Sequence, residues 1–382
     1  AGYLLRTVAF PREPYQAFIA AGTVWFWLGA SLRLGLAVHA ALRGESVPPA
    51  EFNSAYLHLM GWGFLLSFVL GYSLRLLPIF AGSPVASPRL AWTAVACLTT
   101  GTALGVAAII LRNSPASAAA MGITIVGVGA AICGLRLWAP SLSTADVEGQ
   151  WLLRFARTAY FWLAAAAVIL LGLRLAEVAG PVSPLHVHAF GGASRHALTV
   201  GFVSMMIVGV ATRILPIFSG AERPHPLVLP AVFGLLLAGN TLRVIGQMAS
   251  GLWGGGWYAL MGVSGWLETT ALFLFALEVL RLLAGTPENA ALPDVGPEVE
   301  VSLEAPVGPL VAHRPWLVPV FARHGMGQVT NPVFQRTVGR RVTVAQACGR
   351  FQAPPEQFLA ELLDADRANT PMTPGGNLAV AE

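Results

Sequence analysis

The feature that most constrains this chain is a series of apolar runs between Tyr15 and Arg281. Each run exceeds about 18 residues, which is long enough for a helix to cross a hydrocarbon core about 30 Å thick. The chain is 55% hydrophobic and only 11% charged, whereas soluble domains carry roughly 25% charged residues. The bilayer is therefore the expected solvent for most of the chain, and a soluble enzyme is not expected.

The apolar runs predict an all-α fold, a polytopic membrane bundle of about eight transmembrane helices. We expect these helices at about 15–41, 52–80, 89–111, 117–138, 152–177, 195–219, 227–249 and 257–283. After Arg281 the sequence becomes rich in Pro, Gly and acidic residues, which is typical of a linker. The expected organisation is a membrane domain over 1–283, a linker over 284–314 and a small helical soluble domain over 315–382.

An internal repeat relates the two halves of the membrane domain. The stretch His58–Gly82 (HLMGWGFLLSFVLGYSLRLLPIFAG) returns as His196–Gly220 (HALTVGFVSMMIVGVATRILPIFSG), at an offset of 138 residues. One His, one Arg, one Pro and three Gly coincide without a gap, which shared hydrophobicity alone would not produce. We therefore expect two four-helix repeats, about 15–138 and 152–283, related by an axis near the membrane normal.

All 23 basic residues are arginine, and more of them lie at the helix ends on the side of the two termini than on the opposite side. The positive-inside rule then predicts a multi-pass protein of the cell's inner membrane with both ends of its membrane domain in the cytoplasm. The basic pI of about 9.3 reflects these helix-end arginines, so lipid is an expected partner and nucleic acid is not.

Two histidines begin the second and sixth predicted helices at equivalent places. His58 and His196 are expected near the non-cytoplasmic surface, where a pseudo-twofold axis would let their rings face each other. Two neutral imidazoles on facing helices can supply both axial ligands of a haem iron. The alternative is a pair of polar residues that hydrogen-bond between helices.

Four arginines fall toward the same membrane side as the histidines and would neutralise the haem propionates: Arg33, Arg174, Arg195 and Arg243. The alternative for each is that it snorkels to the headgroups or pairs with Glu177 or Glu268. Arg243 is the expected partner of Glu268.

Three further histidines are candidates for a second metal. His186 and His188 are expected in the loop before the sixth helix, and His39 at the end of the first helix on the same side. A His-x-His pair could bind copper or ligate a second haem. The alternative is that these histidines are merely solvated.

The repeated segment resembles the second helix of the main subunits of haem-copper oxidases and of the NnrS family, and its second copy is more similar to NnrS proteins. The resemblance covers roughly residues 50–225. It implies that His58 and His196 are the axial ligands of a low-spin haem b in a protein associated with nitric oxide metabolism. Those families typically have about twelve helices, and this sequence lacks the Trp-x-x-x-His and His-His motifs of the oxidase copper centre. Dioxygen reduction of the oxidase type is therefore not expected.

The tail from about Pro315 resembles a small helical domain of unknown function that occurs fused to redox and iron-sulfur repair proteins. The motif NPVFQRT, followed by a helix start near Thr343, carries this likeness. Some relatives of the domain have paired cysteines, whereas Cys348 stands alone here, so we expect a docking role rather than a redox role.

The functional hypothesis is a membrane haem b protein, a redox subunit that transfers electrons or responds to nitric oxide. A quinol or a redox partner subunit would supply the electrons. No residue is assigned as catalytic. The first alternative is a non-catalytic membrane anchor or accessory subunit of a larger respiratory complex. The second is a transporter built from two repeats, which would have a polar cavity at the midplane.

Overall fold

The structure of the protein, a computed structural model, describes residues 12–44, 47–139, 147–219, 224–284, 294–336, 338–340, 342–351 and 353–369. They form two compact units, and the membrane unit ends at Leu283. Within the described ranges the regular elements are helices, joined only by one isolated bridge between Pro306 and Thr343. The prediction of an all-α helical bundle is confirmed.

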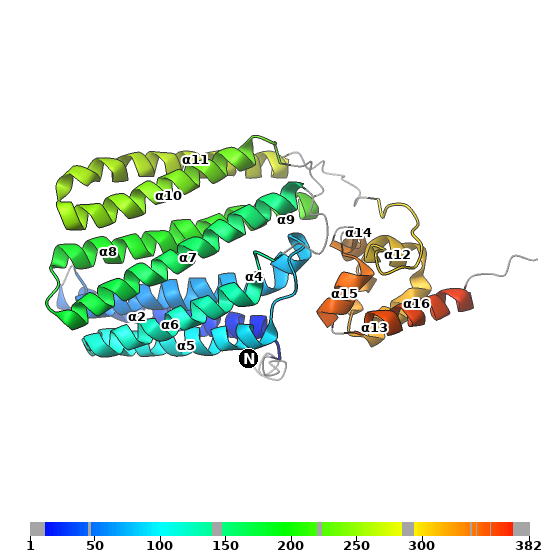
Figure 1. Ribbon diagram of the computed structural model, residues 1–382, viewed down its shortest axis with the longest axis horizontal. Coiled ribbons are helices and arrows are strands. Elements are labelled where there is room, and N and C mark those ends of the chain that lie inside the picture. Colours follow the sequence, from blue (N-terminus) through cyan, green and yellow to red (C-terminus); the bar gives the residue numbers. More distant parts are fainter. Residues whose placement is uncertain are drawn as a thin grey trace, which may run out of the picture. The chain divides into compact units, whose positions relative to one another are not determined.

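Eight helical segments of the membrane unit are long and apolar enough to cross a bilayer. They run in chain order as α2 (Pro14–Arg43), α3–η1–α4 (Ala50–His58, Leu59–Leu65, Leu66–Phe80), α5 (Pro88–Ile110), α6 (Ser114–Leu135), α7 (Val147–Ala179), α8–η2–α9 (Pro184–His196, Ala197–Ser204, Met205–Ser219), α10 (Val228–Trp253) and, after the short turn η3 (Gly255–Trp257), α11 (Tyr258–Ala284). Their long axes lie side by side along the bundle (Figure 1).

The sixth span begins at Pro184, well before the expected start near 195. Its start is set by a local signal, because the Ser183 hydroxyl accepts the His186 N–H and Pro184 occupies the first turn. The fourth span begins in the same way, with Asn113 accepting the Ala116 N–H. Such caps, rather than hydrophobicity, decide where these helices start.

Glycines at equivalent positions let the first helix of each half pack closely against the second. A Cβ at Gly63 would stand 2.8 Å from Trp25 Cγ, and a Cβ at Gly201 would stand 2.6 Å from Trp162 Cγ. The pattern recurs two turns further along, with Gly71 against Phe18 and Gly209 against Phe155. The packing thus pairs α2 with α7 as equivalent helices.

Both repeats contain a π-helical segment at the same place. The segment η1 starts directly after His58, and η2 starts directly after His196. A π-helix has wider turns than an α-helix and occurs frequently at functional sites. The two segments touch near the centre of the bundle, where a Cβ at Gly61 would lie 3.2 Å from Leu198 Cδ2.

The C-terminal unit is a small helical domain, as expected. It contains α12 (Val307–His313), η4 (Pro315–Leu317), α13 (Val318–Arg323), η5 (Gly327–Thr330), α14 (Pro332–Arg336), η6 (Val338–Arg340), α15 (Val344–Phe351) and α16 (Pro355–Asn369). The segment from Asp294, which was expected to be linker, belongs to it. Leu303 packs against the core and its carbonyl accepts the Ala345 N–H. The expected start at 315 is therefore too late.

Cys348 lies in the core of this domain with none of its surface exposed. Burial raises the pKa of its thiol, so little reactive thiolate forms near neutral pH. This environment favours a structural role for the cysteine.

Candidate functional site

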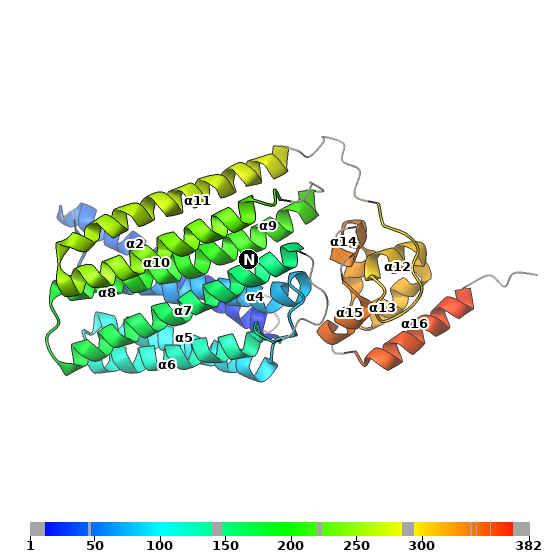
Figure 2. The ribbon, with the colours of Figure 1, turned by 45° about the horizontal axis from the view of Figure 1, so that its top comes forward.

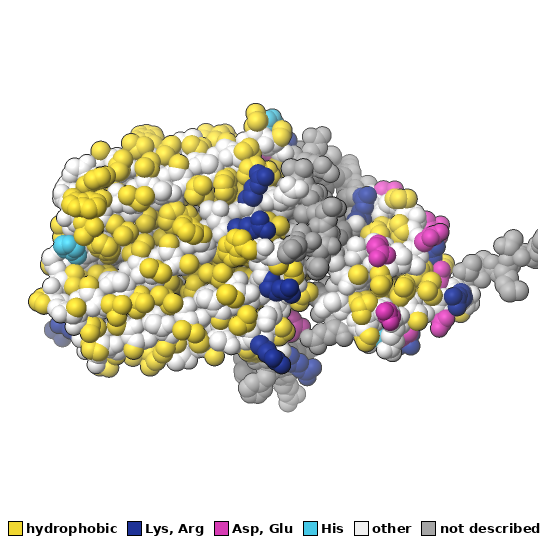
Figure 3. Space-filling view, viewed as in Figure 1, with side chains coloured by type: hydrophobic (Ala, Val, Ile, Leu, Met, Phe, Trp, Pro, Cys, Tyr) yellow, Lys and Arg dark blue, Asp and Glu magenta, His cyan; other side chains and the backbone are white. Residues whose placement is uncertain are grey.

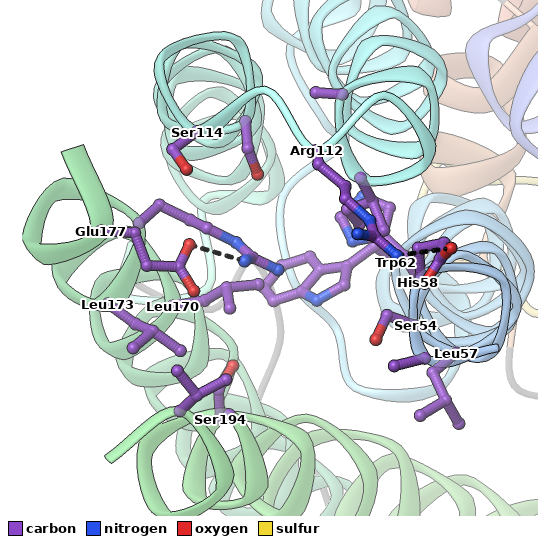
Figure 4. Close-up of a pocket in the computed structure, with 18 of the residues that line it drawn as sticks. Ser54, Leu57, His58, Trp62, Arg112, Ser114, Leu170, Leu173, Glu177 and Ser194 are labelled. Carbon is purple, nitrogen blue, oxygen red and sulfur yellow. Dashed lines mark hydrogen bonds and ion pairs between the residues drawn. The ribbon is translucent and has the colours of Figure 1, made fainter. Parts of the chain in front are cut away.

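A cavity of about 410 Å³ lies at the end of the membrane unit where α3 and α8 begin. The turn from α5 to α6 and the last turns of α7 complete its wall, so both halves of the bundle contribute (Figure 4). Its volume falls in the range of sites for small molecules and cofactors. Leu57, Leu170 and Leu173 give the cavity apolar walls.

Three guanidinium groups line the cavity, and two of them are paired. Arg112 lies 2.8 Å from Glu51, and Arg174 lies 2.8 Å from Glu177 (Figure 4). Arg195 has no ion-pair partner among the described residues. The charged groups that line the cavity therefore sum to a formal charge of +1.

The N-terminus of α6 also faces the cavity. Asn113, Ser114 and Ser117 line it, and the Asn113 side chain satisfies only the Ala116 N–H. The N-terminus of a helix leaves further backbone donors unpaired and carries a partial positive charge. This end of α6 therefore adds to the positive character of the cavity.

His58 stands in the cavity wall, between the two halves (Figure 4). It lies eight residues into its span, counted from Ala50, which places it roughly 12 Å from the helix start and deeper than expected. Its Nε2 atom is buried without a hydrogen-bond partner, and it rests against α5, where a Cβ at Gly105 would be only 2.7 Å away. An unsatisfied buried polar group of this kind costs about 1–3 kcal/mol.

His196 has a different environment, although it occupies the equivalent place. Its Nε2 atom lies 2.9 and 3.1 Å from the two carboxylate oxygens of Glu268 on α11. The expected Glu268–Arg243 pair is therefore wrong. At the repeat offset of 138 residues, Arg243 stands where the first half has Gly105. In the first half, the missing side chain of Gly105 leaves room for the His58 ring. In the second half, Arg243 stands at the equivalent position, and the His196 ring contacts the Glu268 carboxylate.

The two ring nitrogens consequently contact opposite sides of the bundle. His58 Nε2 meets α5 and His196 Nε2 meets α11, and these two helices lie far apart across the bundle in both views (Figures 1 and 2). His196 does not line the cavity. One iron would contact both nitrogens only after both rings had turned.

The structure separates the four arginines that were expected to meet the haem propionates. Arg174 and Arg195 line the cavity. Arg33 instead packs over the ring of Tyr56 at 5.8 Å, and Arg243 lies on α10 with a buried Nε that has no partner. Arg112 was missed as a site residue. Its position just before the Asn113 cap is the signal that could have found it.

The three remaining candidate histidines do not gather. His186 and His188 belong to α8 rather than to a loop. The His186 ring hydrogen-bonds Ser183 and stacks on Phe190, while His188 and His39 are exposed. Across the part of the chain that the structure describes, no three His, Cys, Asp or Glu side chains form a group that could hold a metal ion.

The cavity therefore places an unpaired imidazole beside an excess of positive charge, between the two halves of a membrane bundle. Such a site suits a ligand or cofactor that carries acidic groups. Neither the models of known protein families nor the curated protein sequences match this chain, and the functional assignment rests on this geometry.

Proposed function

We propose that the membrane unit binds haem b in this cavity and serves electron transfer or a response to a diatomic gas such as nitric oxide. The observation that carries the proposal is the buried His58 Nε2, which has no hydrogen-bond partner at the wall of an arginine-lined cavity. Histidine is one of the residues that hold haem iron in proteins. A bound haem would supply one-electron chemistry and an iron able to bind a gas.

The residues present fit this group at His58. The ring must turn from Gly105 toward the cavity, and because its Nε2 makes no hydrogen bond, the turn breaks none. Arg195 would hold one propionate, and Arg174 or Arg112 would hold the other after leaving its carboxylate partner. Leu57, Leu170 and Leu173 would exclude water from the faces of the macrocycle.

His196 would be the second ligand of the iron, and its role depends on Glu268. Both carboxylate oxygens of Glu268 hold the ring of His196, so ligation by His196 requires that this contact be broken. While the contact persists, His58 is the only proposed ligand. The bis-His form is then a second state of the site.

The test is a reduced-minus-oxidised optical spectrum with haem quantification on the purified protein, beside three variants. We expect haem in the wild type and its loss in His58→Ala. His188→Ala is the matched control, because this exposed histidine of α8 does not line the cavity, and it should retain the haem. Loss of a low-spin spectrum in His196→Ala would establish the bis-His form. A colourless wild type, expressed with ample haem, would refute the proposal.

We propose that the protein spans the inner membrane with both ends of its membrane unit in the cytoplasm. Basic side chains gather at the end of the bundle where α7 begins and α9 ends, while apolar side chains cover most of the remaining face of the bundle (Figure 3). By the positive-inside rule this end is cytoplasmic, and the cavity then opens on the opposite side. A quinol or a redox subunit is the proposed electron partner.

The second candidate function is a membrane anchor or accessory subunit of a respiratory complex. The separately folded C-terminal unit, with its own core, favours it as a docking module. Purification from native membranes at low detergent would test it. A stable complex that is lost when residues 294–382 are removed would favour the anchor, and a free chain with haem would favour the redox protein.

A further inference from the structure

We propose that the cavity is an oxyanion-binding site in which Arg195 holds a carboxylate or phosphate group. The inference does not depend on haem, because it follows from the charges and polar groups of the cavity alone. It assigns a ligand class to the space between the two halves.

The first step is the charge balance. Arg112 and Arg174 each have a carboxylate at 2.8 Å, whereas Arg195 has no ion-pair partner among the described residues, although it lines the same cavity. A guanidinium group near a low-dielectric region is stabilised by a counter-ion, and its planar fork matches the two oxygens of a carboxylate or phosphate. One monovalent anion would neutralise the formal charge of the cavity.

The second step is the supply of hydrogen-bond donors. The N-terminus of the long helix α6 faces the cavity with the hydroxyl groups of Ser114 and Ser117, and helix N-termini bind anions through their free N–H groups. His58 lines the same cavity, but its partnerless Nε2 atom faces Gly105 on α5, so it would add a polar group to the site only after its ring had turned.

The third step is the shape of the ligand. A cavity of about 410 Å³ is larger than a bare oxyanion needs, and Leu57, Leu170 and Leu173 line the remainder. The preferred ligand is therefore an anion with an apolar body. Three sources share this chemistry: a soluble organic acid, the phosphate of a lipid headgroup, and a propionate of the proposed haem.

The experiment is calorimetric titration of the purified protein in detergent free of phospholipid, with hexanoate and inorganic phosphate as probes. We expect hexanoate to bind the wild type at one site per chain and more tightly than phosphate. Arg195→Gln should weaken hexanoate binding about tenfold, the loss of one charge-assisted contact. Ser114→Ala should weaken it by a smaller factor. Arg89→Gln is the matched control, since Arg89 is an exposed arginine at the other end of α5, and its affinity should equal that of the wild type.

Competition separates the three sources. If phosphatidylglycerol displaces hexanoate and phosphatidylcholine does not, the source is an anionic lipid. If saturation with haem abolishes hexanoate binding, the source is the propionate, and if neither competes it is a soluble acid. Arginine-dependent binding by a protein that takes up no haem would leave this inference standing while the proposed function fails. No hexanoate binding, or equal binding by the wild type and a folded Arg195→Gln variant, would overturn the inference.

Discussion

The two halves of the membrane unit share a backbone plan but surround their histidines with opposite chemistry. In the first half, the His58 ring lies against Gly105, and the close approach of Gly101 to Thr124 packs α5 against α6. In the second half, Arg243 takes the place of Gly105, and Gly239 packs α10 onto α11 at Glu268. A neutral glycine and threonine are thus replaced by a cation and an anion.

This difference shows how a duplicated bundle can keep its packing while its two sites diverge. The close contacts of Gly63 with Trp25 and of Gly201 with Trp162 preserve the interhelical distances in both halves. In the first site, the His58 nitrogen has no hydrogen-bond partner and its residue lines a cavity. In the second site, His196 contacts the Glu268 carboxylate and does not line the cavity.

Removal of the carboxylate should have the largest effect on stability. Glu268→Ala removes both carboxylate contacts of His196, so the free energy of unfolding should fall by about 3 kcal/mol, the upper end for a hydrogen bond to a charged group. Thr124→Ala, the equivalent change in the first half, should cost much less, because Thr124 Oγ1 bonds only the Ala120 carbonyl of its own helix. Denaturant unfolding in mixed micelles measures both. Equal losses of unfolding free energy in the two variants would mean that Glu268 stabilises the second half no more than Thr124 stabilises the first.

The two histidines should respond differently to replacement by leucine. His196→Leu leaves Glu268 unpaired and should cost about 1–3 kcal/mol of unfolding free energy. His58→Leu removes an unsatisfied nitrogen and should change the free energy of unfolding of the haem-free protein by less than about 1 kcal/mol. The same unfolding assay provides the comparison, and a larger loss in His58→Leu would reverse the assignment of the two environments.

A methyl group at Gly105 should disturb only the first site. The new Cβ would lie 2.7 Å from His58 Nε2, so Gly105→Ala should displace the ring and lower the free energy of unfolding by about 1–2 kcal/mol through overpacking. Gly122→Ala is the control, because nothing lies within 4 Å of a Cβ there, and it should be neutral or slightly stabilising. A shift of the His58 ring resonances confined to Gly105→Ala would locate the effect.

The smallest effect is expected at Thr102, whose hydroxyl donates to the Trp62 carbonyl of η1 at 3.4 Å. Thr102→Val should cost about 0.5–1 kcal/mol. At the equivalent place in the second half, Asn240 has no hydrogen-bond partner for its buried side-chain amide, so Asn240→Leu should be neutral or stabilising. Thermal unfolding of the two variants side by side would detect a difference of this size.

The sequence contained enough information for the fold but only for part of the site. Eight spans follow from length and hydrophobicity, and the repeat follows from shared letters, because both are properties of consecutive residues. The direction of each imidazole is not such a property. His196 and Glu268 are 72 residues apart, and a contact between such distant residues is not visible in any single stretch of sequence.

The predicted depth of the histidines within their spans was wrong because a local signal sets where the helix starts. Hydrophobicity placed the start of the sixth helix near 195, whereas the Ser183–Pro184 signal starts it a full three turns earlier. Arg112 escaped notice because its role comes from the meeting of five helix ends around one cavity, which no single stretch of sequence displays.

The paired π-helical segments also change which way the side chains beyond each histidine face. A π turn holds more residues than an α turn, so the side chains that follow it are rotated about the helix axis from where an uninterrupted α-helix would place them. The segments follow His58 and His196 at the same offset, in copies that align without a gap. Beyond both segments the glycines Gly71 and Gly209 face the first helix of each half, at Phe18 and Phe155.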